Sequence, residues 1–232
     1  MMNASLESCL SFISSQNAPP PGGVKDSGVR RAVTISRQAG CGAVLIAEKL
    51  ARYLQQQAPR PGVNWTVFDR DLMDKVLADH NLPGYLAKFL PEDRISAIED
   101  TLADIVGMRP LVRTVIQQIS ETMLKLAELG SVILIGRGGN IVTAKVPHAL
   151  HVRLVAPMED RIDRICRADH KTPVAARKFC VEEELARTRY LKKYFNVAIN
   201  DPLHYHLIIN TSRVSCDHAA RLIGDALLRL GQ

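Results

Sequence analysis

Short apolar runs alternate with amphipathic stretches along most of the chain, and this alternation predicts strands and helices in turn. Continuous apolar runs of about four to eight residues are typical of strands buried on both faces of a sheet. Five strands are predicted, at residues 32–36, 65–69, 131–136, 149–156 and 206–210. With helices between them, these strands would form a five-stranded parallel sheet covered on both faces. Ligands of such a sheet gather at the carboxyl ends of its strands.

Helices are predicted where apolar residues recur three or four positions apart. The clearest run through residues 43–54, 111–129, 157–165, 173–195 and 220–230, with Thr172 as the cap of the fourth. Residues 70–80 also read as a helix, and residues 83–107 as helical but irregular. Residues 1–29 are rich in Pro, Gly and Ser and are predicted to be a disordered tail. The folded domain would therefore span residues 30–232.

Composition narrows the class of ligand. The 232 residues are 47% hydrophobic, enough for one large α/β domain. A net charge of +6 favours an anionic partner, but the basic residues lie among acids, so small phosphorylated ligands fit better than nucleic acid. Five cysteines without a C-x-x-C pair indicate neither a zinc site nor a disulfide framework, and a reducing cytosol is the default location. No apolar run approaches the ~18 residues of a membrane span.

The first predicted strand leads into a glycine loop, ISRQAGCG at residues 35–42, and then into a helix. Gly40 and Gly42 let the backbone turn sharply and bring its N–H groups to a ligand at a helix N-terminus, where phosphate is favoured. This context is typical of a P-loop. Ala43 and Val44, however, stand where the G-x-x-x-x-G-K-[S/T] motif has its lysine and its magnesium-binding hydroxyl. An ordinary strand-to-helix turn is the alternative interpretation.

Charged residues follow three of the predicted strands. Arg37 comes after the first, Asp69 and Asp71 after the second, and Arg137 after the third, inside GRGGN. Because the carboxyl ends of parallel strands meet at one edge, these side chains are candidates for a ligand site. Surface charges and a tight turn are the simpler interpretation of the same residues.

The two helices after residue 157 are rich in arginine, whose planar fork suits phosphate. Three acid–arginine pairs lie four residues apart, however: Asp160–Arg164, Asp163–Arg167 and Glu183–Arg187. Such pairs are common on helix surfaces and contribute only ~0.2–0.5 kcal/mol each. Spacing alone favours that structural interpretation. His204 and His206 have no carboxylate at a suitable interval, so no metal ligands are predicted.

Four stretches together resemble one known family. ISRQAGCG at 35–42, GRGGN at 136–140, HVRLVAPMEDRIDRI at 151–165 and YHLIINTSR at 205–213 are similar to the cytidylate kinase-like family of P-loop nucleoside monophosphate kinases. The resemblance covers roughly residues 31–230. It implies a three-layer α/β/α fold of the P-loop NTPase type, with a mobile helical lid at about residues 166–196. It also implies transfer of the γ-phosphate of ATP to CMP or dCMP, with Mg²⁺.

The same resemblance implies roles for individual residues. The family loop, typically S-R-Q-x-G-S-G-G, is matched by Ser36, Arg37, Gln38, Gly40, Cys41 and Gly42, with Cys41 in place of a serine. The loop N–H groups and Arg37 would hold the ATP phosphates, and Arg161 and Arg164 would close over them from the lid. Arg137 and Arg187 would bind the acceptor phosphate, with Glu184 as the lid acid that precedes Arg187. Asp69 would hold Mg²⁺ through water or orient the acceptor.

Two departures from the family pattern keep alternatives open. Gly138 stands where cytidylate kinases with a Gly-Arg-Asp strand end have their aspartate, and Ala43 and Val44 replace polar loop residues. The first departure weakens the case for cytosine as the base. The alternatives are a nucleotide-binding module with little or no kinase activity, and a kinase for another small phosphate acceptor. The sequence does not predict an oligomeric state.

Overall fold

The computed structural model describes residues 30–59, 63–69 and 109–230. Its strands are β1 Ala32–Arg37, β2 Thr66–Phe68, β3 Val132–Ile135, β4 Ala149–Val155 and β5 Leu207–Asn210. Its helices are α2 Ala43–Gln57, α5 Arg109–Leu129, α6 Gly139–Val142, α7 Met158–Asp169, α8 Pro173–Phe195 and α9 Cys216–Arg229, with a 3-10 turn at Pro202–His204. The predictions for residues 1–29, 70–80 and 83–107 lie outside the described residues, as does Asp71.

All five strands are parallel and follow the order β2-β3-β1-β4-β5. The chain therefore runs from β1 to the edge strand β2 and returns to β3, beside β1. It then continues with β4 and β5 on the other side of β1. β1 is the central strand, with Ile35 opposite Ile135 of β3 and Ser36 opposite Arg153 of β4. Because the order reverses beside β1, a crevice is expected outside its carboxyl end. The predicted five-stranded parallel sheet is confirmed, and no strand end differs from its prediction by more than one residue.

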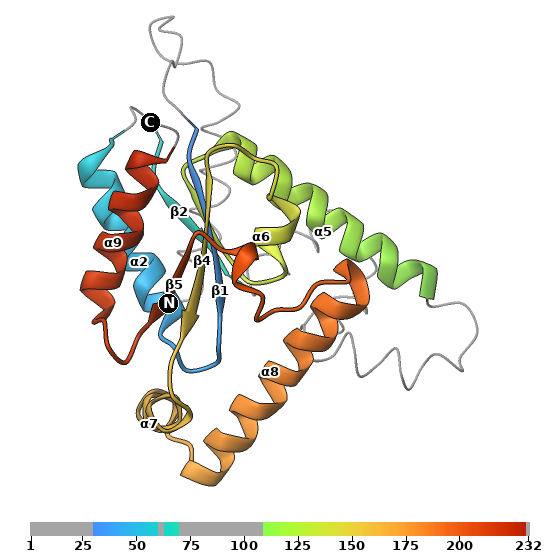
Figure 1. Ribbon diagram of the computed structural model, residues 1–232, viewed down its shortest axis with the longest axis vertical. Coiled ribbons are helices and arrows are strands. Elements are labelled where there is room, and N and C mark those ends of the chain that lie inside the picture. The colour runs from blue at the N-terminus through green and yellow to red at the C-terminus, as the bar shows by residue number, and fades with distance from the viewer. Residues whose placement is uncertain (1–29, 60–62, 70–108, 231–232) are drawn as a thin grey trace, which may run out of the picture.

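Helices cover both faces of this sheet (Figure 1). On one face, Ile46 and Leu50 of α2 and Ile223 of α9 pack against buried residues of β1, β3 and β4. On the other, Ile119 and Met123 of α5 pack against a second set of strand side chains. The inner strands β1, β3 and β4 are buried over most of their length, which explains their apolar runs, whereas the edge strand β5 is partly exposed. The expected three-layer α/β/α fold is confirmed.

Helices α7 and α8 form a hairpin beyond the carboxyl ends of the strands (Figure 1). The predicted cap is confirmed, since the Thr172 hydroxyl accepts a hydrogen bond from the Ala175 N–H at 3.3 Å. The first half of α8 packs with α7 around Ala39 of the glycine loop. Its second half packs Tyr190 and Leu191 against Ile116 of α5. This hairpin contains most of the predicted lid, whose mobility stays a prediction.

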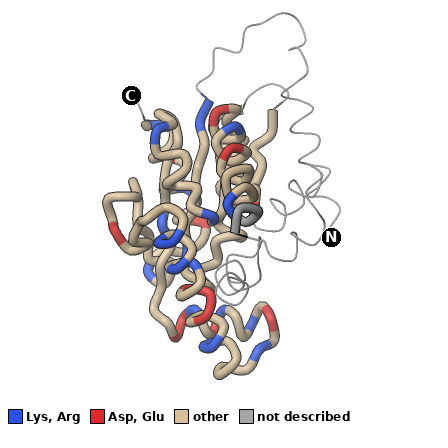
Figure 2. Tube along the Cα trace, turned by 90° about the vertical axis from the view of Figure 1, so that its right-hand side faces the viewer, with Lys and Arg blue, Asp and Glu red and all other residues tan. Residues whose placement is uncertain are grey.

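Charges are interspersed over the described residues (Figure 2), as the sequence suggested. Acidic and basic positions alternate along the α7–α8 hairpin in particular, and the Asp163–Arg167 and Glu183–Arg187 pairs are both present. None of the described helices combines the length and apolarity required to cross a membrane.

Candidate active site

Residues 35–37 of the predicted glycine loop belong to β1, and residues 38–42, called the glycine loop from here on, join the end of β1 to the start of α2. Gly40 and Gly42 have φ values of 80° and 74°, in the left-handed region that side chains disfavour. Gly42 is the N-terminal cap residue of the 15-residue α2, and its carbonyl accepts the Ile46 N–H at 3.0 Å. The first N–H groups of a helix have no partner within the helix, and the helix dipole makes them attractive to phosphate. This local geometry suits an anionic ligand.

Side chains behind the loop fix its path. The Gln38 side-chain carbonyl oxygen accepts the Ala156 N–H at 3.0 Å, which ties the loop to the end of β4. Cys41 is buried, and burial raises the pKa of its thiol despite a hydrogen bond with Thr211 and nearby arginines. The thiol is therefore neutral at physiological pH. Gln38 and Cys41, both predicted to belong to the ATP site, help to hold the loop in shape.

Arg161 and Arg164 of α7 donate hydrogen bonds to backbone carbonyl groups of the glycine loop. Arg161 is buried, and its Nη1 donates to the carboxylate of Glu184 at 2.9 Å and to the Ala39 carbonyl at 3.5 Å. Arg164 donates to the Gly40 carbonyl at 3.3 Å and to both oxygens of Thr211, at 2.7 and 2.8 Å. The sequence placed both arginines over the ATP phosphates. That role stays a prediction. In the structure both arginines contact loop carbonyls and neighbouring side chains, because α7 packs directly against the loop.

Glu184 of α8 is the partner of Arg161. Its ion pair with Arg161 joins α8 to α7, and the carboxylate also lines a cavity described below. The expected Asp160–Arg164 pair is replaced by the contact of Arg164 with Thr211, a residue far away in sequence.

An open cavity lies in front of the glycine loop. This loop cavity has a volume of about 380 Å³ and is lined by residues 37–45 together with Asp69, Ile135, Phe179 and Arg187. It joins the carboxyl ends of β1 and β2 to the inner side of α8. Four predicted site elements, namely the loop, Arg37, Asp69 and Arg187, therefore meet at one cavity.

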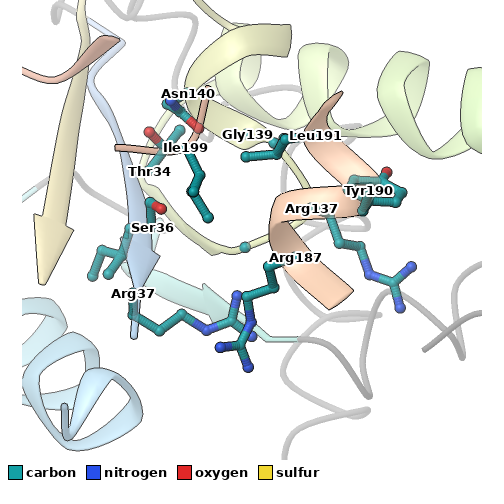
Figure 3. Close-up of a pocket in the computed structure, with 13 residues that line it drawn as sticks. Thr34, Ser36, Arg37, Arg137, Gly139, Asn140, Arg187, Tyr190, Leu191 and Ile199 are labelled. Carbon is teal, nitrogen blue, oxygen red and sulfur yellow. The ribbon is translucent and has the colours of Figure 1, made fainter. Parts of the chain in front are cut away.

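Arg37 and Arg187 line three cavities of this region. Besides the loop cavity, both line a narrower cavity beneath α8 and a polar cavity toward β4. Figure 3 shows their guanidinium groups close together, Arg37 extending from β1 and Arg187 from α8. Arg187 also forms a buried ion pair with Glu183, one turn earlier on α8. Such a pair restricts the arginine fork to one orientation.

Arg137 differs from Arg37 and Arg187 in its backbone conformation and in the direction of its side chain. It lies between Gly136 and Gly138 in a tight turn and has a φ of 53°, and only 2% of its surface is exposed. It lines the narrow cavity with Arg37 and Arg187, but its guanidinium group points away from theirs (Figure 3). The structure thus brings Arg37 and Arg187 together and directs Arg137 elsewhere.

Arg153 is a charged residue of this region that the sequence did not single out. It comes from β4 and donates hydrogen bonds to Ser36 at 2.9 Å and to Asn200 at 2.8 Å. Ser36, predicted to contact ATP, is therefore engaged toward β4. A signal was present in the sequence: His151 and Arg153 alternate with Leu150, Val152 and Leu154, so two polar side chains share one face of a buried strand. Alternation of this kind within an apolar run marks polar residues that need partners.

Metal-binding side chains are not clustered in this region. Among the described residues, no group of three or more His, Cys, Asp or Glu side chains is arranged to hold a metal ion. The described cysteines, Cys41, Cys166, Cys180 and Cys216, are free thiols.

A parallel α/β/α sheet with a glycine loop at the end of its central strand, facing arginines from a helical hairpin, is the architecture of a nucleotide-binding kinase. Comparison with known sequences agrees with that class. The chain belongs to the cytidylate kinase-like family, whose model matches residues 32–213. Membership supports nucleotide kinase activity.

Individual relatives have low sequence identity to this chain but are matched over most of their length. The chain is 26% identical over 175 residues to the cytidylate kinase of Methanopyrus kandleri, covering 72% of this chain and 89% of that protein. It is 22% identical over 169 residues to the cytidylate kinase of Methanocaldococcus jannaschii, covering 72% and 93%. Among solved structures, an uncharacterised protein from Eubacterium ventriosum has a TM-score of 0.63 at 16% identity, covering 86% of this chain and 98% of that one. At that identity, the structural likeness concerns the fold alone.

Proposed function

We propose that the protein transfers the γ-phosphoryl group of ATP to a nucleoside monophosphate, with CMP and dCMP as the favoured acceptors. One observation carries this proposal: Arg37 and Arg187 line the loop cavity with the glycine loop and Asp69. Family membership supports the same reaction class. The two cytidylate kinases named above are the reason for placing a cytosine nucleotide first.

The residues around the loop cavity suit phosphoryl transfer. This reaction needs donor and acceptor held in line and the charge on the equatorial phosphate oxygens neutralised, with little covalent chemistry from the protein. In our proposal, the loop N–H groups at the start of α2 hold the donor phosphates. Arg37 and Arg187 stabilise the negative charge on the group in transfer, and Glu183 keeps Arg187 in position. The acceptor enters between α8 and the strand ends.

Asp69 is the proposed anchor for magnesium. Mg²⁺ prefers oxygen ligands, keeps several waters and is usually held by one or two carboxylates together with substrate phosphates. Among the described residues, Asp69 is the carboxylate that lines the loop cavity, and Val44 offers no hydroxyl there. This donor set fits Mg²⁺ bound through water. When bound, the ion would supply positive charge to the phosphates.

A second candidate function is a nucleotide-binding module with little or no kinase activity. Ala43 and Val44 favour it, because they line the loop cavity where P-loop kinases have a lysine and a hydroxyl. If the protein is a kinase, Arg37 and Arg187 compensate for the missing lysine charge. The two functions therefore differ in turnover, and both require nucleotide binding.

A coupled assay of ATP consumption, run with CMP, dCMP, UMP, AMP and GMP in turn, separates these candidates. We expect turnover with a pyrimidine monophosphate. ATP binding measured by calorimetry, without turnover for any of the five acceptors, would contradict the kinase and support the module. Turnover confined to AMP or GMP would retain the kinase and reject the pyrimidine acceptor.

A further inference from the structure

Arg153 carries a buried positive charge whose partners are neutral. Only 4% of its surface is exposed. Its Nη1 donates to the Ser36 hydroxyl, its Nη2 donates to the Asn200 side-chain carbonyl, and its Cζ lies 5.7 Å from the centroid of the Tyr205 ring. Within the described part of the chain, Arg153 forms no ion pair with a carboxylate, whereas Arg161 and Arg187 each have a glutamate. Burying a charge costs free energy unless an opposite charge accompanies it.

Arg153 also lines a polar cavity of about 100 Å³. We call it the arginine cavity, because Arg37, Arg153 and Arg187 all line it. Gln38, Thr188 and Asn200 add polar groups to the lining. Glu184 is the carboxylate that the described residues contribute to the lining, and it forms an ion pair with Arg161. The volume corresponds to roughly three liquid waters, which is room for one phosphate group.

The arginine cavity adjoins the loop cavity. Arg37, Gln38 and Arg187 line both of them, so the two cavities lie on either side of one pair of arginines. A phosphoryl group passing between two bound molecules needs cations at the midpoint and an anchor for each molecule. The loop cavity contains the anchor proposed for the donor. The arginine cavity offers a separate, positively charged anchor for the acceptor.

We propose that the arginine cavity binds the phosphate monoester of the acceptor and that Arg153 is a direct ligand of that phosphate. The acceptor's identity rests on the proposed function, but the anion site rests on the burial of Arg153, its neutral partners and the cavity. The competing explanation is a purely structural Arg153, which would act as a strut between Ser36 of β1 and Asn200. The two explanations differ in whether anion binding depends on the charge of Arg153.

The experiment compares three variants by calorimetric titration with inorganic phosphate, with CMP and with cytidine. Each titration is made with and without a saturating non-hydrolysable ATP analogue, which occupies the loop cavity. Arg153→Met removes the charge. Asn200→Asp leaves Arg153 in place and gives it a permanent carboxylate partner. Arg177→Met is the matched control, because Arg177 is an exposed arginine of α8 that pairs with Glu159 on the protein surface.

We expect Arg153→Met to weaken phosphate and CMP binding about 10- to 100-fold, the usual effect of losing a charge-assisted contact. Cytidine, which has no phosphate, should bind as in the natural protein. Asn200→Asp should weaken phosphate and CMP similarly while raising the melting temperature, because the new carboxylate neutralises a buried charge. Arg177→Met should bind all three ligands normally.

Unchanged phosphate affinity in Asn200→Asp or in a folded Arg153→Met would overturn the proposal, as would absence of phosphate binding in the natural protein with the ATP analogue present. If Arg153→Met does not fold, Asn200→Asp still tests the proposal, because unchanged phosphate affinity in that variant would overturn it. Failure of the proposed function would look different: phosphate binding would depend on Arg153, yet no nucleoside monophosphate would be phosphorylated.

Discussion

Replacing Gly40 by alanine tests whether the glycine loop is shaped by its contact with α7. Gly40 has a φ of 80°, and a Cβ there would lie 2.6 Å from the Arg161 carbonyl oxygen and 3.0 Å from its Cα. These atoms belong to the backbone of α7, so no side-chain rotation can relieve the overlap. The left-handed conformation costs alanine about 1–2 kcal/mol. Overpacking of a rigid contact adds roughly 1–3 kcal/mol. We therefore expect Gly40→Ala to lose about 2–5 kcal/mol of stability.

Gly42→Ala is the matched control. Gly42 has a similar φ of 74°, but a Cβ there would meet only the Cys216 Sγ, at 3.6 Å, an ordinary contact distance. This variant should lose only the conformational cost, about 1–2 kcal/mol. Urea unfolding of both proteins gives the two free energies directly. ATP titration should show the larger loss for Gly40→Ala as well, because relief of the overlap displaces the loop. Equal losses of stability in the two variants would refute the claim that α7 supports the loop at Gly40.

Three further predictions concern Arg187, His151 and the N-terminal residues. Arg187→Lys keeps the charge beside Glu183 but not the planar fork. We therefore expect kcat/KM for the acceptor to fall about 10- to 100-fold, while the free energy of unfolding changes by less than ~1 kcal/mol. Unchanged kinetics would remove Arg187 from the site. Burial, with a smaller contribution from His206, lowers the pKa of His151 to about 4. Its stabilising contribution is thus complete above its ordinary pKa of 6.5 and is lost as the pH falls toward 4, a change of roughly 3 kcal/mol in unfolding experiments. His151→Asn, which can still bond Thr34, should flatten this pH dependence, and an equally steep profile in that variant would assign the effect to other groups. Deleting residues 1–29 should change stability by less than ~1 kcal/mol, and a large fall in melting temperature would show that the segment docks on the domain.

The inner strands of the sheet were predictable because they are buried on both faces, which leaves apolar runs such as Val132–Ile135. The cap of α8 was predictable for an equally local reason, since Thr172 and Pro173 act within one turn. Helix α6 was missed because GRGGN reads as a turn. That expectation is half right, since Arg137 and Gly138 do adopt left-handed angles, but the four residues that follow complete a helical turn.

The partners of the arginines were not predictable from spacing. Spacing four residues apart identified Glu183–Arg187, in which both side chains lie on one helix face. The same rule failed for Arg164, whose guanidinium reaches Thr211, because only the folded sheet brings α7 beside the residues after β5. Arg153 was overlooked for a related reason. Its partners Ser36 and Asn200 come from distant segments, so the sequence shows a charged residue in a strand but not what surrounds it.

The central step of the proposed function is the passage of a phosphoryl group from ATP in the loop cavity to a nucleoside monophosphate beside α8. The most direct measurement incubates the full chain with CMP, Mg²⁺ and ATP labelled in its γ-phosphate, and then separates the nucleotides by chromatography. We predict label in the β-phosphate of CDP for the natural protein, and about 10- to 100-fold slower labelling for Arg187→Lys, since one charge-assisted contact loses its fork. Label that stays in ATP, or appears only as inorganic phosphate while CMP is unchanged, would contradict the transfer.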